Sequence, residues 1–581
     1  MKQLLAYLKN YKKECVFAPL FKMLEAIFEL LVPLVMAAVI DKGIANHDIP
    51  YIVKMCLVMV FLGIIGLISS VTAQYFAAKA ATGFGTGVRH ALFSHIQRLS
   101  FTNLDKAGTA TLITRMTSDV NQAQNGVNMV LRLFLRSPFI VFGAMIMAFT
   151  IDVRSAMVFV ITIPLLSIVV FGVMYVSIPL YKKVQNRLDS VTLSTRENLT
   201  GVRVIRAFHL EEEEKEKYQE KNQELTKMQM FVGKISGLMN PVTYVIINGA
   251  TAYLIYVGAL QVDTGVITQG EVVALVNYMS QILVELIKLA NLIVTVTKAI
   301  ACCNRIESIL EVPEGERELK REVREELPKE TDEMVVFSHV GLTYENAGAE
   351  SLTDITFSAK KGETIGIIGG TGSGKTSLVH LIPGFYPHTA GSIRIDGKEI
   401  ESYSSEELRD MVGIVMQKAV LFAGSIRKNL CWGKTNATEE ELTEALRTAQ
   451  AYEVVEKKEG KLEAEVAQGG KNFSGGQKQR LTIARALVRK PKILILDDSA
   501  SALDYATDAA LRRAIAGMKE QPTVFIVSQR ASSIQYADKI LVLDDGELAG
   551  IGTHEELLQT CEVYQEIYYS QFPEKKQKGA E

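Results

Sequence analysis

The sequence predicts a six-span α-helical transmembrane domain followed by an α/β domain of the phosphate-loop NTPase class. The first prediction rests on long apolar runs, which are concentrated in the first 300 of the 581 residues. The second rests on the glycine-rich segment GGTGSGKTS at 369–377, which lies between an apolar strand and an apolar helix. A chain of this length exceeds one hydrophobic core, so two or more domains are expected.

Six apolar runs are each about as long as a helix needs to cross hydrocarbon. Residues 158–176, VFVITIPLLSIVVFGVMYV, contain no charge, which argues against a buried helix of a soluble bundle. The polar stretches at 80–127 and 181–242 keep helical apolar spacing and are expected to extend the spans into the cytosol. The six runs lie near 16–40, 55–78, 128–150, 155–178, 243–260 and 272–297.

The distribution of Lys and Arg predicts that both termini and the second domain face the cytoplasm. We expect a bacterial protein. Eleven such residues lie in 181–234 and none in 260–271. The first apolar run is too long for a cleavable signal, so a multi-pass cell-membrane protein is expected. The lysines before the first span are Lys2, Lys9, Lys12 and Lys13.

Charged residues inside the spans suggest a function or a structural pairing. Glu25 and Glu29 are four apart, as are Arg132 and Arg136, so each pair is expected on one helical face. Charge in a bilayer usually faces a cavity or a partner. One hypothesis is a translocation cavity that favours cationic amphiphiles. The other is that the acids pair with arginines or reach toward an interface.

Composition limits the partners. The net charge of −2 gives no reason to expect nucleic acid. The six cysteines form no CxxC pair and have no histidine at metal spacing, so free thiols are expected. The predicted organisation is a membrane domain at 1–312, a charged linker at 313–333, a nucleotide-binding domain at 334–572 and a polar tail at 573–581.

The segment 369–377 satisfies the pattern G-x-x-x-x-G-K-[ST] through Gly369, Gly374, Lys375 and Thr376. Glycines let backbone N–H groups surround phosphates, and the following helix adds its partial positive charge. The lysine is expected at the terminal phosphates of ATP and the Thr376 hydroxyl on Mg²⁺. The other residues expected to bind nucleotide here are Gly370, Thr371, Gly372, Ser373 and Ser377.

The second half of the predicted site is ILILDD at 493–498. Asp497 ends an apolar strand, where a carboxylate is suited to hold Mg²⁺. An isolated Asp after a strand could simply cap the next helix, but the phosphate loop upstream favours the metal.

Several ordered motifs resemble those of type IV ATP-binding cassette (ABC) exporters, in which six spans precede a nucleotide-binding domain. NFSGGQKQR contains Ser474, Gly475, Gly476 and Gln477, which match the signature that binds the γ-phosphate of ATP held by the opposite domain. The segment 197–214 resembles a loop that carries a coupling helix.

Three single residues extend this resemblance. Tyr344 resembles the aromatic that stacks on adenine, and Gln417 the glutamine that senses Mg²⁺ and touches the membrane domain. Asp504 belongs to SALD at 501–504, which resembles the loop that crosses the dimer interface.

The chain departs from this family at the catalytic positions. Hydrolysing members carry glutamate after the magnesium aspartate and a histidine about thirty residues further on, where this chain has Asp498 and Gln529. Aspartate is shorter by about 1 Å, a displacement that can cost about a hundredfold in rate. Gln529 can bond a phosphate oxygen but lacks the charge of histidine. Upstream of the signature, this chain has Gln468 where the family usually has glutamate.

The resemblance therefore implies a half-transporter that binds ATP and hydrolyses it slowly at its own site. A different half-transporter would be its partner, with a small amphiphilic cargo in the lipid bilayer. Three alternatives remain: a slow homodimeric exporter of lipid or peptide, an ATP-gated membrane regulator, and a soluble cassette in translation or repair, which the spans disfavour.

Overall fold

The computed structural model describes residues 2–315, 332–345 and 347–573. The predicted charged linker at 313–333 therefore lies mostly outside the described residues, and the predicted tail at 573–581 does so beyond its first residue. The chain forms two compact units. The first contains residues 1–96 and 109–312, and the second contains residues 97–108 and 313–581.

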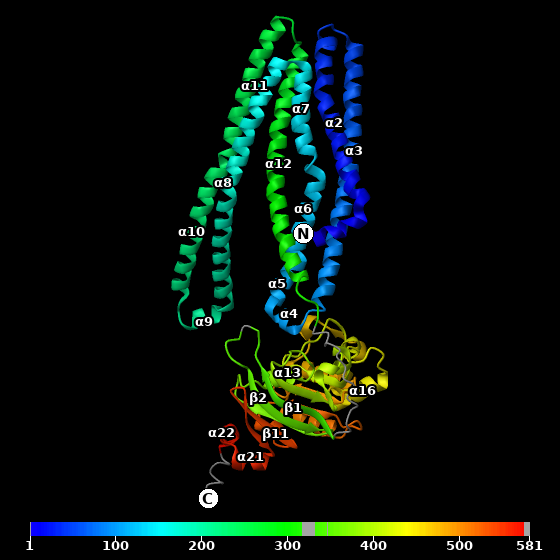
Figure 1. Ribbon diagram of the computed structural model, residues 1–581, viewed down its shortest axis with the longest axis vertical. Helices are drawn as coiled ribbons and strands as arrows, with labels where there is room; N and C mark the ends of the chain where they lie inside the picture. The colour runs from blue at the N-terminus through cyan, green and yellow to red at the C-terminus, as the bar shows by residue number, and fades with distance from the viewer. Residues whose placement is uncertain (1, 316–331, 346, 574–581) are drawn as a thin grey trace. The chain divides into compact units, whose positions relative to one another are not determined.

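The first unit is helical throughout its described part (Figure 1). Six helical stretches are long and apolar enough to cross a membrane, which agrees with the predicted number of spans. They cover 3–44, 49–96, 109–151, 153–200, 211–263 and 269–310. The helices are α1 (Lys2–Leu5), α2 (Lys12–Ala38), α3 (Ile49–Ile96), α5 (Thr109–Thr114), α6 (Val120–Leu133), α7 (Arg136–Ile151), α8 (Val153–Thr200), α9 (Val202–Ala207), α10 (Glu211–Gly237), α11 (Met239–Asp263) and α12 (Gln269–Leu310).

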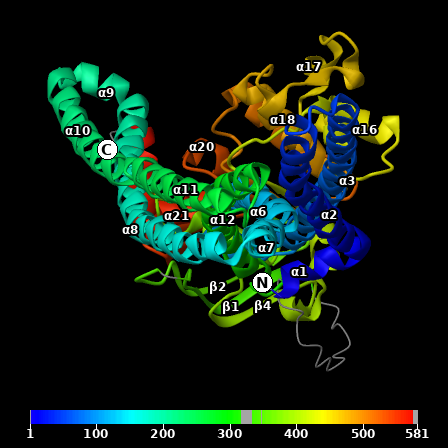
Figure 2. The same cartoon turned by 90° about the horizontal axis from the view of Figure 1, so that it is seen from above.

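Two helices are much longer than a bilayer requires. Helices α3 and α8 have 48 residues each, which corresponds to about 72 Å at 1.5 Å per residue. The hydrocarbon core is about 30 Å thick, so more than half of each helix extends beyond it. Helices α8 and α10 run side by side, joined by α9, and stand apart from α2 and α3 in both views (Figure 1, Figure 2).

Small residues let the helices of the first unit approach closely, as is usual in membrane proteins. Ala26, Ala144 and Ala156 are fully buried in a core built from α2, α7, α8, α11 and α12. The buried Tyr278 hydroxyl donates a hydrogen bond to the carbonyl oxygen of Leu30 at 2.7 Å. Large apolar side chains such as Ile168 and Leu67 are instead exposed, as lipid-facing residues would be.

The second unit contains two principal sheets, which confirms the predicted α/β class. The strands are β1 (Glu333–Leu342), β2 (Leu352–Lys360), β3 (Thr364–Gly369), β4 (Ala390–Ile395), β5 (Lys398–Glu399), β6 (Val412–Val415), β7 (Gly424–Ser425), β8 (Glu465–Val466), β9 (Ile493–Asp497), β10 (Thr523–Val527), β11 (Lys539–Asp544) and β12 (Glu547–Gly552). The helices are α4 (Phe101–Ala107), α13 (Lys375–Leu381), α14 (Ser405–Met411), α15 (Ile426–Leu430), α16 (Glu439–Thr448), α17 (Tyr452–Glu456), α18 (Gly475–Leu487), α19 (Tyr505–Ala516), α20 (Ala531–Ile534), α21 (His554–Thr560) and α22 (Glu562–Gln571).

The six-stranded sheet positions the site. Its order is β12-β11-β3-β10-β9-β6, and all neighbours except β12 and β11 are parallel. Strands β9 and β10 are buried at every position, as expected for parallel strands covered on both faces. A second sheet, β2-β1-β4-β5, is antiparallel and shares a core with β3 through Phe337 and Phe357.

Candidate functional site

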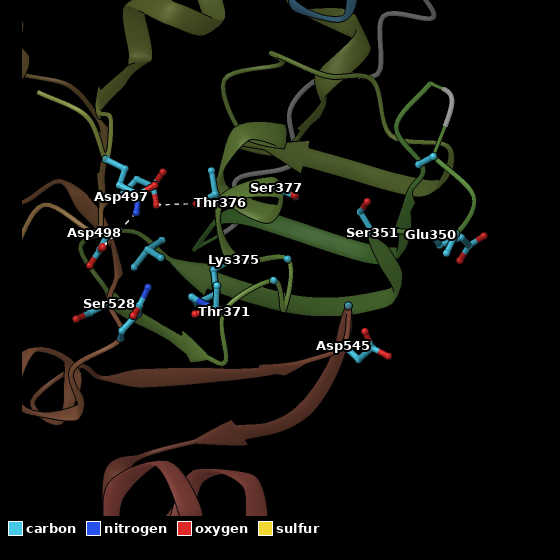
Figure 3. A pocket seen from close by; sticks show the side chains of 18 residues that line it. Glu350, Ser351, Thr371, Lys375, Thr376, Ser377, Asp497, Asp498, Ser528 and Asp545 are labelled. Atoms are coloured by element: carbon cyan, nitrogen blue, oxygen red, sulfur yellow. Dashed lines mark hydrogen bonds between the residues drawn. The ribbon is translucent and has the colours of Figure 1, made fainter. Parts of the chain in front are cut away.

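The carboxyl ends of five parallel strands converge on one cavity of about 520 Å³, as expected for an open α/β sheet (Figure 3). Strand β3 leads into the glycine-rich loop, β9 ends at Asp497, and β10 is followed by Ser528 and Gln529. Strand β6 leads to Gln417, and β11 leads to Asp545. Ten residues predicted from the sequence line this cavity: Thr371, Gly372, Gly374, Lys375, Thr376, Ser377, Gln417, Asp497, Asp498 and Gln529.

The glycine-rich loop requires glycine where it turns into α13. Gly374 has a φ of 90°, and a Cβ there would lie 2.7 Å from Leu352 Cδ2 and 2.8 Å from the Ser351 carbonyl oxygen. The Lys375 ammonium group bonds to the carbonyl oxygens of Gly369 and Gly370 and, at 3.2 Å, to Ser373 Oγ. These contacts fold the lysine over the loop. Burial lowers the pKa of Lys375, against the opposing effect of the nearby carboxylates.

Two side chains whose oxygen atoms could bind a metal ion lie beside the loop. Thr376 Oγ1 donates to Asp497 Oδ1 at 3.1 Å, and Asp497 is only 1% exposed. Burial raises the pKa of Asp497, and the neighbouring Asp498 adds to this effect, whereas the bond from Thr376 opposes it. A buried carboxylate, a hydroxyl and the amide of Gln417 form the hard oxygen donor set that Mg²⁺ prefers. The residues present therefore fit this ion, which would neutralise the buried charge.

Asp498 has an unusual backbone. Its φ is 45°, a left-handed conformation that Asp tolerates better than most residues. The conformation is held by the Asp498 N–H, which donates to the Val527 carbonyl oxygen at 3.0 Å, and by Ser501 Oγ, which donates to the Asp498 carbonyl oxygen at 2.8 Å. The Asp498 carboxylate accepts a bond from Gln417 Nε2 at 3.3 Å. The exposed Gln529 lines the same cavity.

Eight cavity residues were not predicted from the sequence, and four of them have polar side chains: Glu350, Ser351, Ser528 and Asp545. Ser528 and Asp545 each follow a parallel strand of the sheet, so knowledge of the strand order would have identified them. Glu350 and Ser351 precede β2 and carry no motif. Their position near the loop depends on the packing of β2 against Gly374.

Tyr344 lies beside the loop but does not line the cavity in the described structure. Its hydroxyl donates to Ser377 Oγ at 3.0 Å, and its ring packs edge-on against Tyr386 with centroids 5.0 Å apart. Burial raises the pKa of Tyr344.

The signature residues and Asp504 do not line the described cavity either. Ser474 and Gln477 form a capping box that begins α18: Ser474 Oγ accepts from the Gln477 N–H at 3.4 Å, and Gln477 Oε1 accepts from the Ser474 N–H at 3.0 Å. A Cβ at Gly476 would lie 2.9 Å from the Ala502 carbonyl oxygen. Asp504 caps α19 by accepting from the Thr507 N–H at 2.9 Å. Gly475 is the first residue of α18, and Gln468 lies in a short turn at 468–470.

Three of the charged residues singled out in the spans, Glu25, Glu29 and Arg136, form ion pairs. Arg136 donates to Glu285 at 2.7 Å and to Glu29 at 2.6 Å, while Glu25 pairs with Lys22. Of the two hypotheses for the charges in the spans, the one in which an acid pairs with an arginine is observed for Glu29. The Glu29 side chain remains 41% exposed.

One detail of that prediction is wrong, because Arg132 and Arg136 do not share a helix. Helix α6 ends at Leu133, and α7 begins at Arg136 after a two-residue turn. Pro138 explains the break, since it has no N–H to donate to the carbonyl of Phe134.

The fold and cavity define a membrane-spanning phosphate-loop ATPase. The chain belongs to the ABC transporter family, as two family models and its relatives show: residues 15–286 match the ABC transporter transmembrane region and residues 352–501 match ABC transporter. It is an exporter-type member with transmembrane and ATP-binding domains, and ABC ATPase domains bind ATP, generally with Mg²⁺.

Relatives match over the whole chain. An uncharacterized ABC transporter ATP-binding protein of Bacillus subtilis is 35% identical over 98% of this chain and 99% of its own length. A putative multidrug export ATP-binding/permease protein of the same organism is 31% identical over 98% of each chain. A fatty acid ABC transporter ATP-binding/permease protein of Mycobacterium bovis is 31% identical over 81% of this chain and 74% of its own.

A solved structure shares the fold. It is that of a bacterial Atm1-family ABC exporter with ATP bound, with a TM-score of 0.76 and 22% identity over 96% of this chain and 98% of that one.

Proposed function

We propose that this chain is one subunit of a heterodimeric ATP-driven exporter in a bacterial cell membrane. Its own site binds ATP with Mg²⁺ and hydrolyses it slowly, and its signature completes the hydrolysing site of a different half-transporter. The observation that carries this proposal is the presence of Asp498 and Gln529 in the cavity that also holds an intact phosphate loop.

The chemistry of the cavity supports binding without rapid turnover. The loop, Lys375, Thr376 and Asp497 provide donors and oxygen ligands for a nucleotide and Mg²⁺. The residue expected to orient the attacking water is the short Asp498, whose carboxylate accepts a hydrogen bond from Gln417 instead of extending freely. General-base assistance is worth roughly a hundred- to ten-thousandfold, so a misplaced base slows the reaction while leaving affinity intact.

Two features favour a second chain. Ser474 to Gln477 form a well-capped helix start away from the chain's own cavity, where they are available to ATP held by another domain. The segment around α9 exposes Val204 (59%) and Phe208 (70%), although it lies at the polar end of long helices. Exposed apolar residues at such a place are available to pack against another domain.

The cargo that fits best is a small amphiphile. Relatives carry the names multidrug export protein and fatty acid transporter, and both imply molecules that partition into a bilayer. In this chain Glu25 and Glu29 are paired with cations, so the membrane unit offers no unbalanced acid at these positions for a cationic cargo. The proposed cargo is therefore an amphiphile, and we infer no preference for positively charged cargo.

The heterodimer is tested by affinity purification of the tagged chain from its native membranes. The expected result is a one-to-one complex with a different half-transporter that has glutamate and histidine at the positions of Asp498 and Gln529. Recovery of the chain with only itself, together with brisk ATP-driven transport, would refute the proposal. Transport measured in vesicles against ATP consumed separates an exporter from an ATP-gated regulator.

A further inference from the structure

Three side chains of the second unit connect Asp497 to α4. His380, in the last turn of α13, places Nε2 3.9 Å from Asp497 Oδ2. The His380 ring stacks on Tyr386, with centroids 6.2 Å apart and planes at 18°. The Tyr386 hydroxyl donates to Asp105 Oδ2 at 2.6 Å. A continuous line of contacts therefore runs from the expected magnesium ligand to a helix that lies, in sequence, between two membrane spans.

A second set of contacts anchors α4 to the same loop. The ring of Phe101 stacks on Phe385, with centroids 4.4 Å apart, and Phe385 packs against His380 at 5.5 Å. The Arg409 guanidinium lies over both phenyl rings, 6.0 Å and 5.7 Å from their centroids. A displacement of the His380 ring would thus reach α4 through Tyr386 and through Phe385.

The His380 end of this line is incompletely bonded. A hydrogen bond between nitrogen and oxygen spans about 2.7–3.2 Å, so the 3.9 Å separation from Asp497 is too long for one. Within the part of the chain that the structure describes, the buried Nε2 has no hydrogen-bond partner. Leaving a buried ring nitrogen unpaired is unfavourable, so a small movement of Asp497 toward it would be favoured. Burial lowers the pKa of His380.

The surroundings leave room for such a movement. A cavity of about 290 Å³ lies between the segment that precedes and begins α4 and the loop that follows α13. Its lining includes Ser100, Asn103, Phe385, Tyr386 and His388. Because one side of this contact is not close-packed, α4 can shift without a clash.

We propose that His380 is a positioning residue that transmits the state of Asp497 to α4 through Tyr386 and Phe385. Asp497 accepts a hydrogen bond from Thr376. When Asp497 binds Mg²⁺ with the nucleotide, the distance between Asp497 and His380 Nε2 changes. The stack of His380 on Tyr386 and the hydrogen bond from Tyr386 to Asp105 then become tighter. This inference rests on the proposed binding of ATP and Mg²⁺ at the cavity, but not on the proposed heterodimer.

The test is hydrogen exchange measured by mass spectrometry on the full-length chain with ATP and either Mg²⁺ or EDTA. Protection at 369–377 reports nucleotide binding, and protection at 97–108 reports the state of α4. In the wild type, Mg²⁺ is expected to slow exchange at 97–108 by about threefold or more. His380→Phe keeps the ring stack and removes Nε2, so it should abolish this difference and retain protection at 369–377. Tyr386→Phe, which removes the bond to Asp105, should do the same.

His388→Phe is the matched control. His388 lies on the same loop, where its Nε2 is 3.3 Å from Glu401 Oε1 and not on the route from Asp497. This variant should behave as the wild type. The proposal is overturned if His380→Phe keeps the magnesium-dependent difference, if His388→Phe also loses it, or if wild-type α4 shows none. Absence of protection at 369–377 in the wild type would refute ATP binding itself. This outcome differs from a failure of transmission, in which 369–377 is protected but 97–108 does not respond to Mg²⁺.

Discussion

Gln417 Nε2 donates a hydrogen bond to Asp498 Oδ2 at 3.3 Å, across the carboxyl ends of β6 and β9. The residue that follows the expected magnesium ligand therefore accepts a hydrogen bond from a neighbouring side chain. The fixed backbone of Asp498, with its left-handed φ, sets where this short carboxylate can reach. In the proposed function this geometry explains slow turnover.

Neutralising Asp498 should have little effect. If its carboxylate is already too short to assist the attacking water, Asp498→Asn should lower the residual ATP turnover by less than about threefold, whereas loss of a working base costs roughly a hundredfold or more. Steady-state phosphate release by the purified chain measures this. A hundredfold loss would show that Asp498 is an effective base after all.

A negative charge in the signature should impair the partner's site and not this chain's fold. Ser474→Asp keeps the helix cap, since Asp caps as well as Ser, but places a carboxylate where a γ-phosphate is expected. ATP turnover of the proposed heterodimer should fall about tenfold or more, because each 1.4 kcal/mol of repulsion is a factor of ten.

Thr553→Asp is the control, because Thr553 forms the equivalent capping box at the start of α21. It should leave both turnover and thermal stability unchanged. Equal turnover in Ser474→Asp and the wild type would contradict a role of this signature in hydrolysis.

Replacing the buried Asp497 by Asn should stabilise the ligand-free protein. Burial raises the pKa of Asp497 in the folded state above its unfolded value. The ionised carboxylate therefore costs stability at neutral pH, and this cost disappears as pH falls below the unfolded value. The Tm without ligand should rise by about 2 °C, and the rise on adding Mg²⁺ with ATP should be lost.

Asp508→Asn is the contrasting control. Asp508 is also buried, but it pairs with Arg512 and accepts a hydrogen bond from Ser533, both at 3.2 Å. Its neutralisation should lower the Tm. If Asp497→Asn also lowers the Tm measured without ligand, the ionised carboxylate of Asp497 does not destabilise the protein.

Arg136 should be essential for the stability of the first unit. Removing it in Arg136→Met leaves the buried Glu285 with Lys288 as its cation and takes the arginine away from Glu29, and breaking a buried ion pair costs up to about 3–5 kcal/mol. The double variant Arg136→Met with Glu285→Met should be more stable than the sum of the two single effects predicts, because the contact between the two residues can be lost only once. Thermal unfolding in detergent measures both, and simple additivity would show that the pair is not coupled.

Most of the fold could be predicted from the sequence because its signals are local. Six apolar runs and the strand before Gly369 each depend on neighbouring residues, and the structure places them in helices long enough to cross a membrane and in β3. The predicted site residues that line the cavity come from motifs at strand ends. What could not be predicted depends on strand order and packing, as with Asp545 after β11 and Glu350 before β2.

Of the two remaining differences, one has a local cause and the other a tertiary cause. The helix break before Arg136 follows from Pro138, a local signal that was present in the sequence but not used. The grouping of residues 97–108 with the second unit depends on Phe101 and Asp105 meeting Phe385 and Tyr386, which are nearly 300 residues away. Contacts between residues so far apart produce no repeating pattern in a single sequence, so they could not be predicted from it.

The most direct test of slow turnover at this chain's own site is ATP hydrolysis by the purified chain, measured beside ATP binding. The wild type should bind ATP with Mg²⁺ and hydrolyse it slowly, and Asp498→Glu with Gln529→His should raise turnover about tenfold or more without changing affinity. Rapid hydrolysis by the unmodified chain, or no gain in the double variant, would contradict the account.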